Sequence, residues 1–273
     1  MLSTNVIPLS VWQLLLIYAL LTLSLGLLLW QRVGIVREVL IAITRMTVQL
    51  ALVGLYLTFL FEQKSLLWNG IWLAVMLVTA NFTTLKRAKM VRRKFFFRTL
   101  AVTSFASLLT VTLLLAVVSG SVRHSLFYDA RYLIPLMGML LGNSMAANVI
   151  SLETFYRSLR ERQKEFETMR LLGATVAEAT QPFRVTALRA AMNPLIASMA
   201  TMGIVSLPGM MTGQMLGGSP PMTAVAYQLA ILVSIFSLSV VSATCNILAS
   251  IPVAMDACGN LRHDVLLAQT SRR

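Results

Sequence analysis

The hydrophobic pattern of this chain consists of long apolar runs separated by polar connections that hold most of the charges. Each run is close to the roughly 20 residues that a helix needs to cross a bilayer. The first run, from residue 8 to residue 30, contains no Lys, Arg, Asp or Glu, and six more follow at about 46–61, 66–85, 99–119, 132–151, 194–216 and 222–250. The pattern predicts an all-α, polytopic membrane helical bundle with about seven transmembrane helices, and an eight-span count is less economical.

Three of these runs have features of their own. The first lacks a basic leading region, so we interpret it as a retained helix and not as a cleaved signal peptide. The second is short, and we expect it to extend back through Val39–Thr44 and to place Arg45 near the headgroups. Pro208 and Gly209 interrupt the run at 194–216, which predicts a broken helix beside a pathway.

Composition agrees with a membrane protein. Of the 273 residues, 57% are hydrophobic and 12% are charged, and the mean hydropathy is +0.77. We therefore expect a single transmembrane domain over residues 1–273. The net charge of +13 sits between the apolar runs and not on a soluble basic face, so nucleic-acid binding is not expected.

The placement of the basic residues predicts an orientation. Alternate connections, at 31–45, 86–98, 151–193 and 251–273, hold 20 of the 23 Lys and Arg residues. By the positive-inside rule these connections are cytoplasmic, which places the N-terminus outside and the C-terminus inside.

Several function classes lack the residues that they need. The cores of the runs contain no Asp, Glu, Lys or His, which disfavours an ion-coupled carrier, and the last run has no Lys for a retinal Schiff base. None of the five lysines follows a glycine as in a P-loop, so any ATP would bind another chain. No nucleophile with a base partner stands out, and we expect no enzyme activity. Cys245 and Cys258 indicate neither a disulfide framework nor a metal site.

The longest polar connection, residues 152–193, has an amphipathic pattern. Its apolar residues recur at helical spacing: Leu152, Phe155, Tyr156, Leu159, Phe166, Met169 and Leu172. An interfacial helix would explain this pattern, but the charges on the other face have mixed signs, which suits docking to a protein better than binding to anionic lipid.

Within that connection a short motif resembles the cytoplasmic loop of the permeases of ATP-binding-cassette (ABC) transporters, which inserts into the ATPase subunit. Glu167 precedes Gly173 and Ala174, and Phe183 and Val185 follow about ten residues later. The resemblance implies that these five residues couple the chain to an ATPase. Thr168 and Met169 stand where that family has two alanines.

A second motif extends the resemblance over essentially the whole chain. The segments 134–145 and 203–214, followed by Tyr227 and Gln228, resemble the FetB (YbbM) family of permeases. This family implies a membrane subunit that pairs with a separate, FetA-like ATP-binding subunit and is associated with iron export and oxidative stress resistance. Related plant proteins are linked to aluminium tolerance.

The site residues expected from this reading fall into two groups. Gly138 and Gly142 have the small-xxx-small spacing of close helix packing. The pathway or hinge candidates are Gln49, Asn143, Pro208, Gly209, Met210, Met211, Gln214 and Gln228. The 16 methionines are assigned mainly to packing, because iron prefers oxygen or imidazole ligands, and no metal ligand is named.

The sequence therefore predicts the permease subunit of an ABC transporter in a bacterial inner membrane, as a homodimer surrounded by lipid. It is expected to export iron or another metal ion, with ATP and Mg on the partner subunit and no cofactor in this chain. Two alternatives stay open: an ATP-independent channel or carrier, and a membrane scaffold or sensor that recruits a cytoplasmic protein.

Overall fold

The computed structural model describes residues 10–63, 65–119, 130–256 and 261–262, and within these ranges it contains helices and no strand. The all-α prediction is confirmed. The helices are α1 (Val11–Trp30), α2 (Val36–Gln63), α3 (Leu66–Arg87), α4 (Arg92–Ser119), α5 (Ala130–Glu161), α6 (Gln163–Leu171), α7 (Val176–Thr201), α8 (Gly209–Leu216) and α9 (Pro221–Ala254).

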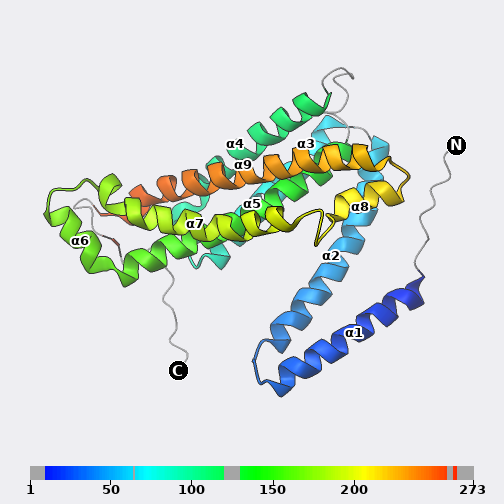
Figure 1. The fold of residues 1–273 in the computed structure, drawn as a ribbon, viewed down its shortest axis with the longest axis horizontal. Helices are drawn as coiled ribbons and strands as arrows, with labels where there is room; N and C mark the ends of the chain where they lie inside the picture. Colours follow the sequence, from blue (N-terminus) through cyan, green and yellow to red (C-terminus); the bar gives the residue numbers. More distant parts are fainter. Residues whose placement is uncertain (1–9, 64, 120–129, 257–260, 263–273) are drawn as a thin grey trace.

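The centre of the molecule is a bundle in which α5 and α9 lie side by side. Helix α4 packs on both of them, α3 packs on α4 and α5, and α7 covers the other side of the α5–α9 pair. Figure 1 shows these helices running nearly parallel along the long axis of the molecule, with α6 at one extremity and α8 towards the other. The chain thus reaches the same ends of the bundle repeatedly, as a multi-span membrane protein must.

Buried residues divide the bundle into two main clusters. One joins the α3–α4 connection, the end of α5, α6, the start of α7 and the end of α9, and it includes Met90, Phe95, Phe155, Phe166 and Phe183. We call this region the basic end, because the Arg- and Lys-rich connections adjoin it. The other cluster joins α3, α4, α5 and the first half of α9. We call the region around α8 and the start of α9 the mouth end.

Helix α1 and most of α2 stand away from this bundle, and the end of α2 packs on α3 and α5 (Figure 1). Helix α1 makes its few contacts with α2, and neither helix buries its apolar span within the chain. The Tyr18 hydroxyl lies 2.5 Å from Thr47 Oγ1 and joins the two helices. Apolar helices so exposed are stable where lipid or another protein chain covers them.

Six of the described helices are long and apolar enough to cross a membrane: α1, α2, α3, α4, α5 and α9. The second starts at Val36, which confirms that the predicted run extends back beyond residue 46. The predicted run at 194–216 is not one helix in the structure. It is divided between the end of α7 and the short α8, and the more polar first half of α7 belongs to the basic end.

Candidate substrate pathway and coupling surface

The predicted helix break is confirmed between α7 and α8. Residues 202–208 are not helical, Gly203 has a φ of +88°, and Pro208 is the N-cap of α8. A positive φ is easily reached only by glycine, and proline has no N–H with which to continue a helix. The Gly203 N–H instead donates to Ser206 O at 2.8 Å, so the turn partly satisfies its own backbone. Ile204 is 92% exposed in the single chain.

A cavity of about 300 Å³ lies beside this break, between α7, α8 and α9. Met199 and Met202 line it from α7, Met211 lines it from α8, and Gln228 and Leu229 line it from α9. The pathway candidates Pro208, Met211 and Gln228 are therefore brought together by the fold. Gln228 Oε1 is buried and accepts no hydrogen bond from the described residues.

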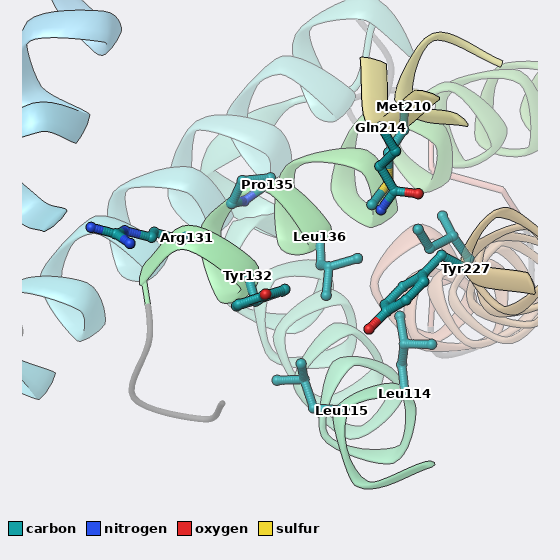
Figure 2. Close-up of a pocket in the computed structure, with 10 residues that line it drawn as sticks. Leu114, Leu115, Arg131, Tyr132, Pro135, Leu136, Met210, Gln214 and Tyr227 are labelled. Carbon is teal, nitrogen blue, oxygen red and sulfur yellow. The ribbon is translucent and has the colours of Figure 1, made fainter. Parts of the chain in front are cut away.

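A second, smaller cavity of about 50 Å³ lies at the mouth end, between α4, α5, α8 and α9. Figure 2 shows Met210 and Gln214 on one side of it, with the Tyr227 hydroxyl directed towards Leu114 and Leu136. Gln214 Oε1 is also buried, with no hydrogen-bond partner among the described residues. Met210 and Gln214 thus share one cavity and are separate from Gln228.

Arg131 lines the edge of the smaller cavity but is directed away from Gln214 (Figure 2). Its guanidinium lies over the Phe61 ring of α2, 5.6 Å from the centroid. A cation–π contact of this kind fixes the side chain against α2. The interior of the cavity is therefore lined by neutral polar groups and apolar side chains.

Of the remaining pathway and packing candidates, Gln49, Gly142 and Asn143 are exposed, and Gly138 faces α3. Gln49 is exposed on α2, and Asn143 is exposed on α5, where its Nδ2 donates to Met139 O of the same helix. Gly138 faces Met76 of α3, whose Cε would lie 3.5 Å from a Cβ at that position. Gly142 has no such neighbour, so its surface is open in the single chain.

A buried polar network that the sequence analysis did not single out joins α4, α5 and α9. Asn246 Nδ2 donates to Thr103 Oγ1 and to Asn148 Oδ1, each at 3.2 Å, and Asn148 Nδ2 donates to Ser242 Oγ at 3.2 Å. Hydrogen bonds between membrane helices stabilise them modestly, by about 0.6 kcal/mol on average. The sequence feature that could have indicated this network is the set of hydroxyl and amide side chains at helical spacing in three apolar runs.

At the basic end, the 152–193 connection folds back on the bundle. Phe183 is fully buried and packs edge-to-face on Phe166, with the ring centroids 6.5 Å apart. Arg162 lies over the Phe183 ring at 5.3 Å and pairs with Glu165. Phe183 is therefore an internal anchor of this segment and is not presented to a partner, whereas Val185 is exposed.

The outermost part of the basic end is the turn between α6 and α7. Leu171 and Leu172 are 88% and 83% exposed, and Gly173 follows with a φ of +94°. Ala174 is partly buried, and its carbonyl accepts from Arg170 at 2.7 Å. Leu172 has the helical spacing of the apolar residues before it, but α6 ends at Leu171, and Leu172 lies exposed in the turn.

A capping box holds the start of α7 directly after this turn. The Thr175 hydroxyl and N–H both donate to Glu178 Oε2 at 2.7 Å, and the Glu178 N–H donates back to Thr175 Oγ1 at 3.3 Å. These two hydrogen bonds from Thr175, first the side-chain and then the backbone one, lower the pKa of the Glu178 carboxyl. Glu167 lies exposed on α6, where its carboxylate accepts from Gln163 Nε2 at 2.7 Å.

The described residues hold no group of three or more His, Cys, Asp or Glu side chains placed to bind a metal. Methionine and glutamine side chains line both cavities at the mouth end, and the smaller one is also lined by Arg131, Tyr132 and Tyr227. At the basic end, a groove of about 500 Å³ between α7 and α9 is lined by Arg170, Arg184 and Asp256 among apolar residues.

Comparison with known proteins identifies the family. Residues 11–253 match the uncharacterised protein family UPF0014. The chain belongs to this family. Over 218 residues it is 31% identical to the UPF0014 membrane protein YjkA of Bacillus subtilis, a match that covers 80% of this chain and 84% of the relative. This UPF0014 protein has no match among solved structures.

Two further relatives carry names that refer to metals. The chain is 26% identical over 243 residues to the probable iron export permease protein FetB of Escherichia coli, covering 89% of this chain and 90% of the relative. It is 29% identical over 202 residues to the protein ALUMINUM SENSITIVE 3 of Arabidopsis thaliana, covering 74% and 71%. The resemblance to FetB found in the sequence motifs is thus confirmed, and this UPF0014 protein is a FetB-like membrane protein.

Proposed function

We propose that this UPF0014 protein is the membrane-spanning permease subunit of an ABC transporter that exports iron or another metal ion. The relative named as an iron export permease supports the class of cargo. Energy comes from a separate ATPase subunit that binds ATP and Mg. The chain works as a homodimer in the bacterial inner membrane, with the basic end and the C-terminus in the cytoplasm and the N-terminus outside.

One observation supports this proposal above the others: the exposed, apolar turn at the end of the 152–193 segment. Leu171 and Leu172 lie on a turn that is held on one side by the buried Phe166–Phe183 contact and on the other by the Thr175 capping box. A firmly supported apolar projection on a charged surface is typical of a protein interface. It lies where ATP-driven movement of a partner would reach α5 and α7.

The mouth end offers the complementary feature. Alternating access requires elements that change their arrangement, and hinges are a few residues at element ends. The break at residues 202–208 separates α7 from α8 beside two cavities, and α8 packs on α9. In our proposal, displacement of α7 at the turn moves α8 and opens or closes the mouth.

The test is affinity purification of the full chain from its own membranes, followed by identification of the bound proteins and an ATPase assay with and without ferrous iron. A P-loop ATPase in the eluate and iron-stimulated turnover support the proposal. Replacing Leu171 and Leu172 by Asp is expected to remove the ATPase. The matched control is Leu216→Asp, because Leu216 is 66% exposed but lies at the mouth end.

Other outcomes separate the alternatives. Metal flux through the purified chain without an ATPase would make it a channel or carrier. An ATPase partner without flux from the reconstituted complex would favour a scaffold or sensor. An ATPase that binds the Leu171/Leu172 variant as well as the unchanged chain would overturn the coupling surface but not the class of protein.

A further inference from the structure

The larger mouth cavity gathers three methionines from both sides of the helix break. Met199 and Met202 lie at the C-terminal end of α7, and Met211 lies in the first turn of α8. Each is half-buried and lines the same space of about 300 Å³. Methionine in a core usually fills gaps, but here the three methionine side chains line a space that they do not fill.

The fourth notable group is the amide of Gln228 on α9. Its side chain lines the cavity and is 8% exposed, and its Oε1 accepts no hydrogen bond from the described residues. A buried acceptor left without a donor costs on the order of 1–3 kcal/mol. A protein keeps a destabilising acceptor of this kind most readily where the oxygen binds a ligand.

The chemistry of these donors selects among cations. Thioethers are soft, neutral ligands that favour Cu(I), whereas Ca²⁺, Mg²⁺ and other hard cations take carboxylate, carbonyl and water oxygens. Met199, Met202, Met211 and Gln228 carry no formal charge, so they suit a cation of low charge. Three sulfur donors and one amide oxygen provide four ligands, a coordination number that a soft monovalent ion accepts.

We propose that the cavity at the α7–α8 break is a binding site for a soft monovalent cation, Cu(I) or Ag(I), held by the thioethers of Met199, Met202 and Met211 and by Gln228 Oε1. Because Met199 and Met211 lie on opposite sides of the non-helical segment, a bound ion links α7 to α8. The proposal rests on the donor groups that line the cavity. It does not depend on the proposed ATPase coupling or on iron as cargo.

The experiment is titration of the purified full chain in detergent with Ag(I), a redox-stable stand-in for Cu(I), followed by isothermal calorimetry. X-ray absorption of the loaded protein reports the ligand atoms directly. We expect sulfur scatterers around the silver ion, and we expect ferrous iron at the same concentration not to displace it. Oxygen and nitrogen scatterers alone, or displacement by ferrous iron, would overturn the proposal.

Variants locate the site. Replacing Met199, Met202 and Met211 together by Leu keeps apolar volume and should weaken Ag(I) binding by more than about 100-fold, since even outer-shell changes cost 10–100-fold in metal affinity. Gln228→Leu should weaken it by about tenfold. The control is Met137→Leu, a fully buried methionine of α5 outside the cavity, which should bind as the unchanged chain does.

Unchanged affinity in the triple variant would place the silver ion elsewhere and would contradict the assignment. Size-exclusion profiles and thermal unfolding show whether the triple variant is folded. If it is not, the X-ray absorption of the unchanged chain still tests the proposal, because a silver ion without sulfur ligands would contradict it.

Discussion

The two ends of the bundle differ in what fills their interiors, and each also has an opening, which at the basic end is the groove of about 500 Å³ between α7 and α9. At the basic end, the aromatic residues Phe95, Phe155, Phe166 and Phe183 are buried with almost no exposed surface. At the mouth end, a helix is interrupted, two cavities open beside α8, and two glutamine oxygens are buried without a hydrogen-bond partner among the described residues.

The difference shows where the chain is rigid and where it is adaptable. Close-packed aromatic side chains transmit a displacement, because interiors of this kind have low compressibility. Cavities and unpaired polar groups lower stability, and proteins keep them where binding or movement requires them. The basic end is thus suited to transmit a displacement caused by a partner, and the mouth end is suited to change its conformation when that displacement reaches it. The predictions below test this contrast, in order of decreasing effect on stability.

Phe183→Ala should have the largest effect. Removing a fully buried phenylalanine leaves a cavity and is expected to lower the free energy of unfolding by about 3–5 kcal/mol. Thermal unfolding in detergent measures the loss. Val185→Ala, two residues away and exposed, serves as control and should change stability by less than about 0.5 kcal/mol. Equal losses in both variants would show that the basic end is not packed as described.

Gln214→Leu should act in the opposite direction. The side chains have similar size, and the leucine removes a buried oxygen that has no hydrogen-bond partner among the described residues. The free energy of unfolding should rise by about 1–2 kcal/mol, the typical penalty of an unsatisfied buried polar group. The same thermal measurement checks the sign. A loss of stability would mean that Gln214 is satisfied in the folded protein, which removes one difference between the two ends.

Gly173→Ala should destabilise through the backbone alone. The Gly173 φ of +94° is unfavourable for residues with a Cβ, while a Cβ there meets no heavy atom within 4 Å. The expected loss is about 1–2 kcal/mol. Gly142→Ala is the matched control, because Gly142 is helical and equally open, and it should be neutral or stabilising by up to about 1 kcal/mol. Identical behaviour of the two variants would contradict a left-handed turn at Gly173.

Thr175→Ala should cost about 1 kcal/mol, because it removes the N-cap hydroxyl that accepts the Glu178 N–H. Thr175→Ser retains the hydroxyl and should recover most of the loss. Hydrogen exchange in the first turn of α7 measures the effect locally. Unchanged exchange in the alanine variant would show that the cap does not hold this turn.

The smallest predicted effect is a pH dependence of the same cap. Hydrogen bonds from Thr175 lower the pKa of Glu178 in the folded protein, so the ionised carboxylate stabilises the fold above its unfolded pKa of about 4.3. The stabilisation is lost as the pH falls through the lower, folded pKa. Glu178→Gln should abolish this part of the pH dependence between neutral and acid conditions. A profile that is the same in both proteins would argue against the capping box.

Much of the fold follows from the sequence because the bilayer imposes simple requirements. Apolar runs of sufficient length had to become helices, since lipid offers no partner for backbone N–H and C=O groups. Even the break near Pro208 and Gly209 was predictable, because proline and glycine disrupt a helix in any surroundings. The residues that meet at the break were harder to predict: Gln214 and Gln228 lie 14 positions apart and line different cavities.

The apolar residues at the basic end show what motif spacing and periodicity cannot predict, namely which side chains are buried. Phe183 and Val185 resemble a pair in a coupling motif, yet one is buried and the other is exposed. Leu172 continues the helical spacing of the apolar residues before it, but the helix ends one residue earlier. Periodicity assigns a face only while the helix continues, so a residue at a helix end takes its direction from the turn.

The sequence by itself determined the all-helical membrane class, the family, most of the spans and the position of the helix break, because these depend on local composition and on short motifs. Only the tertiary structure decided that α5 and α9 form the centre, that Asn148 and Asn246 share one network, and that Met199, Met202 and Met211 border one cavity. These contacts join residues far apart in the chain, and they depend on how the helices pack and rotate against one another, which no local pattern encodes.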